Sequence, residues 1–327
     1  MAADRATLSV VVPVHNEEAV LHEFQRRLAA VLDSLDCEAE VVFVNDGSTD
    51  GSLAALHQFH RDDPRVGVVD LSRNFGKEIA MTAGLDCAVG DAVIVIDADL
   101  QDPPECIPEM VGAWRSGCDV VLMRRRSRRH EGWIKTATAA AFYRTIGRMS
   151  MVDIPENVGD FRLLSRRAVD ALRRFPERSR FMKGLFAWIG FPARQIEYDR
   201  DGRHAGKTKW TYWRLWNFAL EGITSFSAAP LKLASYIGLA TSVAAFLYGA
   251  WVIAKTLIVG DPVPGYPTLV TLVLLLGGLQ LMALGIIGEY LARMFVEVKQ
   301  RPLYLVQQHL APRRAAAPDA RGDEASR

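Results

Sequence analysis

The sequence lacks several of the signals that identify common classes of protein. No Gly-x-Gly-x-x-Gly follows the first apolar run, and Gly-x-x-x-x-Gly-Lys-Ser/Thr is absent from the 327 residues. These absences argue against a dinucleotide-binding domain and a P-loop nucleotide hydrolase. The four cysteines show no Cys-x-x-Cys spacing, and no signal-peptide pattern precedes them. We therefore expect reduced thiols in a cytosolic domain.

The sequence also lacks an excess of either positive or negative charge. It contains 39 Lys and Arg residues and 38 Asp and Glu residues, which gives a net charge of +1. The net charge therefore identifies no partner. The basic residues are nevertheless unevenly placed, with concentrations at residues 124–129 and 203–214.

Residues 93–104 are the most informative stretch that is present, with the sequence Val-Ile-Val-Ile-Asp-Ala-Asp-Leu-Gln-Asp-Pro-Pro. The short apolar run predicts a central strand that is covered on both faces. Asp97 and Asp99 follow it, and in an extended segment residues two apart point to the same side. With the oxygen of Gln101 they form an all-oxygen set suited to Mg²⁺ or Mn²⁺. A solvated acidic turn that caps the next helix is the alternative.

Apolar runs alternate with helical periodicity in the first part of the chain, which predicts a Rossmann-like α/β domain with a mostly parallel sheet. In such sheets ligands bind at the carboxyl ends of the strands. Every expected strand ends in a polar cluster, and five clusters on one rim indicate a site rather than a chance cap. The expected strands are residues 8–14, 40–44, 66–71, 92–96 and 119–123.

Two long apolar runs occupy the last third of the chain. Residues 231–257 and 269–292 each exceed the roughly 20 residues that cross a bilayer core. The connector, residues 258–268, carries no Lys or Arg, whereas basic residues flank the outer ends of both runs. The positive-inside rule then predicts that residues 1–205 and 293–327 are cytoplasmic, in a multi-pass protein of the inner membrane. Buried core helices are the alternative.

Two further segments have distinct compositions. Residues 206–230 mix aromatic and basic residues, which predicts amphipathic juxtamembrane helices on the membrane surface. Residues from about 311 to 327 are rich in Ala, Arg, Pro and Asp, so we expect a disordered tail there.

Five motifs in matching order resemble those of the family 2 inverting glycosyltransferases, over residues from about 8 to 300. The chain is most similar to the polyprenyl-phosphate glycosyltransferases, relatives of dolichol-phosphate mannose synthase. Its two apolar runs resemble those of the bacterial bactoprenol (undecaprenyl-phosphate) glucosyltransferases. The resemblance implies a GT-A-type nucleotide-sugar domain, followed by membrane-surface helices and two transmembrane helices. The motifs are Val-Pro-Val-His-Asn-Glu-Glu (12–18), Val-Asn-Asp-Gly-Ser-Thr-Asp-Gly (44–51), Leu-Ser-Arg-Asn-Phe-Gly-Lys-Glu (71–78), Asp-Ala-Asp-Leu-Gln-Asp-Pro-Pro-Glu (97–105) and Asn-Val-Gly-Asp-Phe-Arg-Leu (157–163).

The resemblance also implies roles for individual residues. Two positions depart from the family pattern, since His15 stands where Tyr is common and Asn45 replaces a frequent Asp. The implied residues are Pro13, His15 and Glu17 for the nucleotide pocket, Asp46 for the base, Lys77 for the donor side, Asp97, Asp99 and Gln101 for the metal on the diphosphate, and Arg203 and Lys207 for donor or acceptor phosphates.

Asp160 is placed by the resemblance near the reacting centre. The acceptor would be a phosphate monoester, whose second pKa of about 6 leaves it largely dianionic near neutral pH. Because such a nucleophile needs little help from a base, we expect Asp160 to orient the acceptor or the sugar, with base catalysis as the secondary role. A helix cap or a salt bridge to Arg162 is the alternative.

The densest cluster of charge follows the fifth expected strand. Arginine clusters can hold phosphate by bidentate hydrogen bonds. We expect this cluster, and Arg124 and Arg128 in particular, to grip the acceptor phosphate. A solvated loop and attraction to anionic lipid headgroups are the alternatives, and nucleic-acid binding is disfavoured. The members are Arg124, Arg125, Arg126, Arg128 and Arg129.

The sequence therefore predicts an enzyme that moves a sugar from a nucleotide diphosphate sugar to polyprenyl phosphate, with UDP-glucose as the favoured donor. GDP-mannose, UDP-N-acetylglucosamine, UDP-galactose and a UDP-aminoarabinose donor stay open. A processive polysaccharide synthase is disfavoured because Gln-x-x-Arg-Trp is absent. An inert membrane anchor on this fold is the rival of another class. Four glycines in the second apolar run weakly support a homo-oligomer, with a tetramer among the options.

Overall fold

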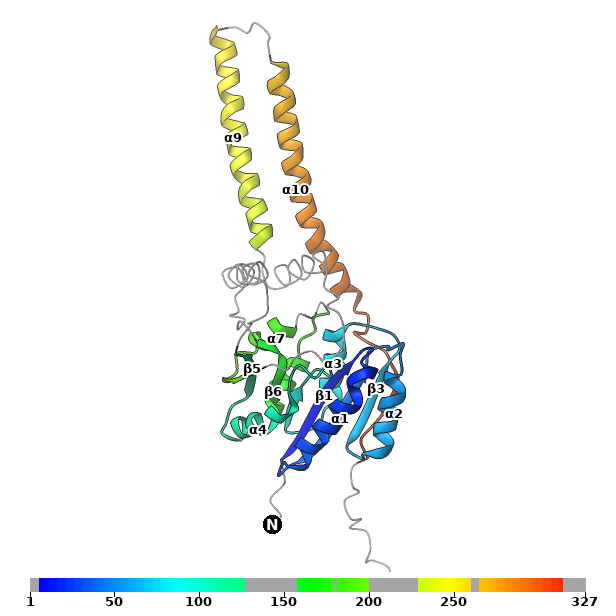
Figure 1. Cartoon of the computed structure of the whole chain (residues 1–327). Helices are drawn as coiled ribbons and strands as arrows, with labels where there is room; N and C mark the ends of the chain where they lie inside the picture. The colour runs from blue at the N-terminus through cyan, green and yellow to red at the C-terminus, as the bar shows by residue number, and fades with distance from the viewer. Residues whose placement is uncertain are drawn as a thin grey trace, which may run out of the picture. The chain divides into compact units, whose positions relative to one another are not determined.

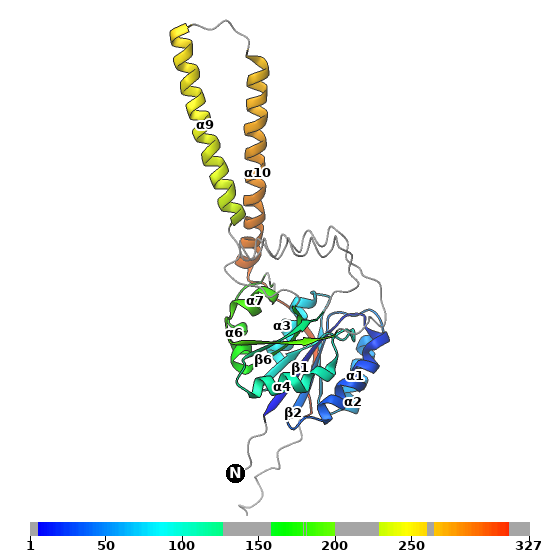
Figure 2. The ribbon, with the colours of Figure 1, turned by 60° about the vertical axis from the view of Figure 1, so that its left-hand side comes forward.

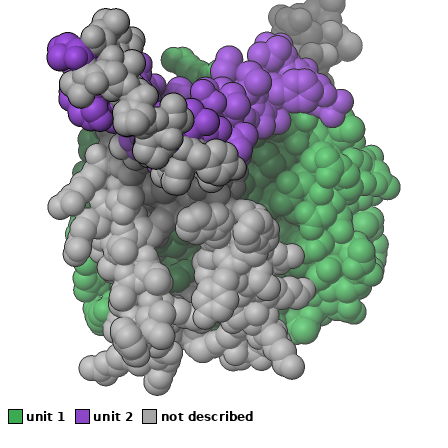
Figure 3. Space-filling model, turned by 90° about the horizontal axis from the view of Figure 1, so that it is seen from above, with its two compact units in different colours: residues 1–140, 154–211, 302–327 green, residues 141–153, 212–301 purple. Residues whose placement is uncertain are grey.

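The computed structural model of the chain divides it into two units (Figures 1 and 3). The first unit takes in Met1–Ala140, Ile154–Thr211 and Pro302–Arg327, and the second takes in Ala141–Asp153 and Tyr212–Arg301. The chain therefore leaves the first unit twice and returns to it each time. The structure describes residues 6–126, 158–178, 180, 182–199, 229–259 and 265–313.

One sheet of eight strands forms the centre of the first unit, in the order β7-β5-β6-β4-β1-β2-β3-β8. The parallel pairs β1–β2, β1–β4 and β2–β3 confirm the predicted, mostly parallel α/β arrangement. The strands are β1 (Thr7–Val14), β2 (Glu38–Asn45), β3 (Val66–Leu71), β4 (Ala92–Val95), β5 (Val120–Arg125), β6 (Val158–Ser165), β7 (Ala193–Tyr198) and β8 (Val306–Leu310).

The direction of β6 matters most for the site. β6 is antiparallel to both β4 and β5, so β5 points the same way as β4. The amino end of β6 therefore meets the carboxyl ends of β4 and β5 at one rim. The sequence did not predict this strand, although it singled out the motif at its start.

Helices cover both faces of the sheet, which explains why β1 is apolar along its whole length (Figure 2). Val10 and Val12 face the core that contains Phe24 of α1. Val11 faces the other way, because a Cβ added to Gly84 of α3 would collide with it. The helices of this unit are α1 (Glu18–Asp33), α2 (Ser52–Asp62), α3 (Lys77–Cys87), the 3₁₀ turn η1 (Pro104–Cys106), α4 (Ile107–Arg115), α6 (Arg166–Arg173) and α7 (Met182–Trp188).

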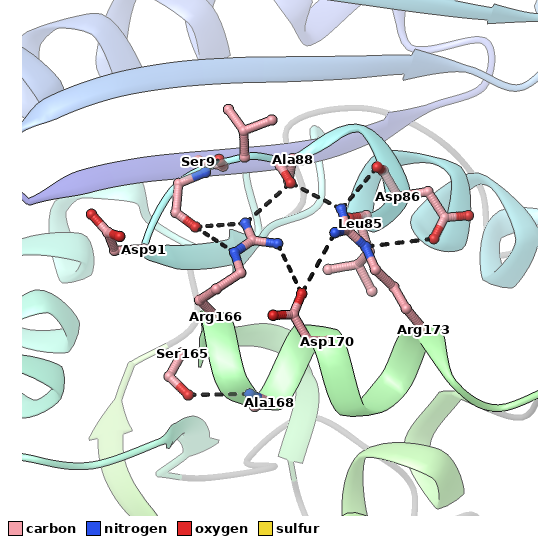
Figure 4. A network of polar contacts seen from close by, with 12 residues as sticks. Ser9, Leu85, Asp86, Ala88, Asp91, Ser165, Arg166, Ala168, Asp170 and Arg173 are labelled. Carbon is pink, nitrogen blue, oxygen red and sulfur yellow. Dashed lines mark hydrogen bonds and ion pairs between the residues drawn. The ribbon is translucent and has the colours of Figure 1, made fainter.

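A polar network ties α6 to the end of α3 (Figure 4). The guanidinium of Arg166 donates to the carbonyl oxygen of Ala88 at 3.0 Å, and that of Arg173 donates to Leu85 at 2.6 Å. Asp170 lies 3.6 Å from each guanidinium. Since β6 leads directly into α6, this network fixes the strand relative to α3.

β8 is an element that the sequence did not predict. It pairs antiparallel with the edge strand β3, and just before it the carbonyl of Leu305 accepts from the amide of Ser72 at 2.9 Å. After it, the guanidinium of Arg313 donates to the carbonyls of His60 and Arg61 at the end of α2, both at 2.8 Å. We call residues 302–313 the strap. Its last three residues fall within the tail that was expected to be disordered.

The second unit contains two long helices that pack side by side, α9 (Ala229–Val259) and α10 (Tyr266–Lys299) (Figures 1 and 2). Within the described residues, one stretch is long and apolar enough to cross a membrane, Leu275–Lys299, with a mean hydropathy of 1.5. The predicted pair of transmembrane helices is thus not confirmed, and the span at residues 231–257 stays a prediction.

Some predictions concern residues that the structure does not describe. Residues 206–228, 260–264 and 314–327 lie outside the described part of the chain. The juxtamembrane helices, most of the connector and most of the tail therefore stay predictions.

Candidate active site

Three predicted site residues meet at the rim where β4 ends and β6 begins. Nζ of Lys77, the first residue of α3, lies 2.6 Å from Oδ2 of Asp97 and 2.5 Å from Oδ2 of Asp160. The strand register explains the convergence, because Val95 pairs with Arg162 and each carboxylate lies two residues further toward the rim. The turn after β4 and the start of β6 thus share one ammonium group.

The charges of this cluster are strongly coupled. Burial alone would lower the pKa of Lys77, but Asp97 and Asp160 raise it above its ordinary value. Burial raises the pKa of Asp97, against the opposing effect of Lys77. Although burial opposes it, Lys77, Lys183 and Arg162 hold the pKa of Asp160 below its usual range. Asp160 is therefore ionised, and its Oδ1 is buried with no hydrogen-bond partner among the described residues.

Two residues that the sequence did not assign to the site support this cluster, the buried Arg162 and the partly buried Glu78. Arg162 is 3% exposed and donates to the carbonyl of Gly159 at 2.7 Å, and burial lowers its pKa to about 10. Oε2 of Glu78 accepts from the amide of Met182 at 3.1 Å, and burial together with Asp160 raises the pKa of Glu78 to about 7. Glu78 directly follows Lys77, which was the available signal for it.

Asp46 holds the loop that delivers Lys77. Its two carboxylate oxygens accept from the backbone amides of Phe75, at 2.7 Å, and Gly76, at 2.9 Å. Gly76 has a φ of 97°, a conformation that a glycine adopts without strain, and α3 starts at the next residue. Asp46 is 3% exposed. The structure therefore gives it a structural task, and its contact with a nucleobase stays a prediction.

The other residues expected to line the nucleotide pocket lie around the end of β1. Nδ1 of His15 lies 2.9 Å from the carbonyl oxygen of Asp46, and the side-chain amide of Asn74 lies 3.0 Å from Nε2 of the same ring. Pro13 is buried within β1, and the amide of Glu17 donates to Ser52 at 3.0 Å at the start of α1. Asn74 joins His15 from the loop before Lys77.

The turn after β4 carries the predicted metal ligands. Oδ1 of Asp99 accepts from the amide of Gln101 at 3.0 Å, a contact typical of aspartate in turns. Among the described residues, no group of three or more His, Cys, Asp or Glu could hold a metal. A donor set of two carboxylates and an amide oxygen still fits Mg²⁺, which usually completes its shell with water and substrate phosphates. The ammonium of Lys77 against Asp97 is a further sign that this position attracts cations.

The structure separates the arginines at the end of β5, since successive side chains of a strand point to opposite faces. Arg124 and Arg126 pair with Glu197, at 4.0 and 3.6 Å, and are largely exposed. Arg125 points the other way, with Nε 3.4 Å from the hydroxyl of Tyr198. Arg128, Arg203 and Lys207 lie outside the described residues.

Residues 9–173 match the family described as glycosyl transferase family 2. The chain belongs to glycosyl transferase family 2. Its first unit has the Rossmann-like GT-A-type α/β fold of these glycosyltransferases, and residues 229–294 match the GtrB C-terminal hairpin.

Two curated relatives match this glycosyltransferase over nearly its whole length. An uncharacterized glycosyltransferase of Synechocystis sp. is 52% identical over 299 residues, 91% of this chain and 94% of that protein. The prophage-derived bactoprenol glucosyl transferase of Shigella flexneri is 47% identical over 301 residues, 92% of this chain and 97% of that protein.

A more distant likeness is found among solved structures. Glucosyl-3-phosphoglycerate synthase of Mycobacterium tuberculosis, in complex with Mn²⁺, uridine-diphosphate-glucose and phosphoglyceric acid, is 20% identical with a TM-score of 0.45. The match covers 67% of this glycosyltransferase and 78% of that chain.

Proposed function

We propose that this glycosyltransferase moves glucose from UDP-glucose to a polyprenyl phosphate, undecaprenyl phosphate in bacteria, to supply a lipid-linked sugar for modifying cell-envelope glycans. The observation that carries the proposal is the ammonium of Lys77 shared between Asp97 and Asp160. This shared ammonium joins the turn after β4, which suits a diphosphate, to the start of β6, which suits an acceptor. The bactoprenol glucosyl transferase relative, at 47% identity, supports the choice of acceptor and sugar.

On the donor side, Asp97, Asp99 and Gln101 would hold Mg²⁺ or Mn²⁺. When bound, such an ion supplies positive charge that stabilises the leaving diphosphate without proton transfer. Lys77 would add a second positive charge on the same side, and the loop held by Asp46 keeps it there. Pro13, His15 and Glu17 would bind the nucleotide.

On the acceptor side, positioning matters more than deprotonation. The nucleophile is a phosphate that is already largely dianionic near neutral pH. Asp160 has a lowered pKa, so it is a weak base and a stable anion. We infer that it orients the sugar or the acceptor relative to the donor. Arg124 and Arg128 would grip the acceptor phosphate, and Arg203 and Lys207 would contact donor or acceptor phosphates.

The acceptor's prenyl chain requires a membrane, and the second unit supplies apolar helices. We propose that α9 and α10 both span the inner membrane, with residues 1–205 and 293–327 in the cytoplasm. The match of residues 229–294 to a C-terminal hairpin supports a paired arrangement. A homo-oligomer stays part of the proposal, because an added Cβ at any of four glycines of α10 would meet nothing within 4 Å. These are Gly277, Gly278, Gly285 and Gly288.

A donor panel tests the proposal. The purified protein is mixed with undecaprenyl phosphate, Mg²⁺ and one nucleotide sugar at a time, and free nucleotide and prenyl-phosphate sugar are both measured. UDP-glucose should give the highest rate, and Asp99→Asn should lower it by roughly 100-fold or more while the protein stays folded. A higher rate with GDP-mannose or UDP-N-acetylglucosamine would replace the donor, and no product with any donor would favour an inert anchor.

A further inference from the structure

Asp102 is the third carboxylate of the turn after β4, and it is 1% exposed. The hydroxyl of Tyr198, the last residue of β7, donates a hydrogen bond to Oδ1 of Asp102. The same hydroxyl lies 3.4 Å from Nε of Arg125. A chain of contacts thus runs from the turn that carries Asp97 and Asp99, through Tyr198, to the end of β5.

The far end of Arg125 lies over the start of β6. A Cβ built on Gly159 would be 3.0 Å from a terminal guanidinium nitrogen of Arg125, so the guanidinium covers the residue before Asp160. The pairing of Arg125 with Tyr198 in the β5–β7 register keeps the two side chains together. Although burial opposes it, Tyr198, Asp102 and Asp160 raise the pKa of Arg125, so the group stays cationic.

We propose that Tyr198 is a positioning residue for sugar transfer: its hydroxyl ties Arg125 to the turn that carries Asp97 and Asp99, and so holds the guanidinium over Gly159 beside Asp160. The inference rests on the proposed function, which assigns the turn to the donor and β6 to the acceptor. The tyrosine ring has a separate, structural role, because it packs edge-on against Phe161 with centroids 6.1 Å apart.

Loss of the hydroxyl has a specific consequence. A buried carboxylate that loses a donor is strongly disfavoured until another donor takes its place. Arg125 is the cation already beside the hydroxyl, so its guanidinium should move toward Asp102 and away from Gly159. The spacing between the donor turn and the start of β6 then changes, although every charge is still present.

Three variants of the full-length protein separate positioning from packing. Tyr198→Phe removes only the hydroxyl and keeps the ring. Gly159→Ala displaces the guanidinium of Arg125 from the other side, without touching Tyr198. Tyr304→Phe is the matched control. Tyr304 lies in the strap, and its hydroxyl donates to another carboxylate, Oδ2 of Asp86, at 2.9 Å.

The readouts are kcat and KM for each substrate, the double variant, and amide hydrogen exchange across residues 97–102. We expect Tyr198→Phe and Gly159→Ala each to lower kcat about tenfold with little change in KM for the nucleotide sugar. The double variant should be no slower than the slower single one, because both changes displace the same group. Tyr304→Phe should keep its kcat within about twofold of the unmodified protein.

Each alternative result decides the matter. An unchanged kcat in Tyr198→Phe, fully additive losses in the double variant, or an equal loss in Tyr304→Phe would overturn the positioning role. If the unmodified protein transfers no sugar at all, the proposed function fails instead. Hydrogen exchange still decides in that case, since faster exchange of the 97–102 amides in Tyr198→Phe and not in Tyr304→Phe supports the tie, and equal exchange rejects it.

Discussion

Lys77 is the residue on which the charge balance of the site depends. Its ammonium contacts both Asp97 and Asp160, and those carboxylates expose only 24% and 15% of their side chains. Without the shared cation, two anions would face each other in a partly buried position, and such pairs cannot both remain ionised at ordinary pKa values. The low pKa of Asp160 therefore depends on Lys77 and Lys183 from other parts of the chain, as well as on Arg162 of its own motif.

This dependence predicts the behaviour of Lys77→Gln. The pKa values of Asp160 and Asp97 should both rise, so the acid limb of the pH–rate profile should lie at higher pH in the variant than in the unmodified protein. The maximal rate should also fall by roughly 100-fold, as expected when a preorganised charge near the leaving group is removed. Steady-state kinetics across pH provide the measurement, with Arg26→Gln as the control, because Arg26 lies exposed on α1 and pairs with Glu23. An acid limb at the same pH in Lys77→Gln and in the unmodified protein would contradict the coupling.

Glu78 gives a prediction for stability. Its folded-state pKa of about 7 lies above the ordinary value of 4.5, so the ionised form is disfavoured in the fold. The contribution of Glu78 to the free energy of unfolding is complete below the pKa of the unfolded state, and it is lost as the pH rises to about 7. Glu78→Gln keeps an oxygen for the Met182 amide and carries no charge.

The thermal midpoints of Glu78→Gln and of the unmodified protein are measured in detergent at pH 4.5 and pH 8. The difference between them should shift in favour of the variant by roughly 5 °C from the lower pH to the higher. Glu105→Gln is the control of opposite sign, because its hydrogen bond with Arg27 lowers the carboxyl pKa. A difference in midpoint that stays constant with pH would remove Glu78 as the cause.

Among the elements, the strap carries the clearest prediction. It covers the edge of β3 and holds the amide of Ser72, where the loop that leads to Lys77 begins. A chain that ends at Arg301 would expose the hydrogen-bonding groups of β3, and exposed edges promote aggregation. The thermal midpoint of this truncated chain should lie roughly 5 °C or more below that of the full chain. A chain that ends at Arg313 keeps the strap and should melt like the full chain, so equal melting of both truncations would refute the role.

The elements that the sequence predicts are those with continuous apolar runs. Residues 66–71 and 92–96 are examples, and the structure has strands there at Val66–Leu71 and Ala92–Val95. β8 gives no such signal, because Val306-Gln-Gln-His-Leu310 is mostly polar and exposed along an edge. The contact between Lys77 and Asp160 was also beyond prediction, because it depends on the antiparallel pairing of β6 with β4. Local patterns identify the site residues, whereas register decides which of them meet.

At the scale of the whole molecule, the chain passes into the second unit at Ala141 and again at Tyr212, and it returns to the first unit each time. Both ends of the helical hairpin are thus connected to the nucleotide-sugar unit, and residues 302–313 contribute to that unit's own fold. This arrangement suggests that the hairpin can be removed without loss of the first unit, provided that the strap is kept. A variant in which a flexible Gly/Ser linker replaces residues 212–301, and with them most of the segment predicted to lie on the membrane surface, meets that condition.

That variant should remain folded and should bind nucleotide, but it should no longer sediment with membranes. Its rate with undecaprenyl phosphate in vesicles should fall by roughly 100-fold, because the enzyme and its acceptor no longer share a surface. Its rate with a short, water-soluble prenyl phosphate should stay within about threefold of the full chain, since the reacting groups lie in the first unit. Equal losses with both acceptors would mean that the hairpin contributes to the reaction itself and does more than bring the site to the membrane.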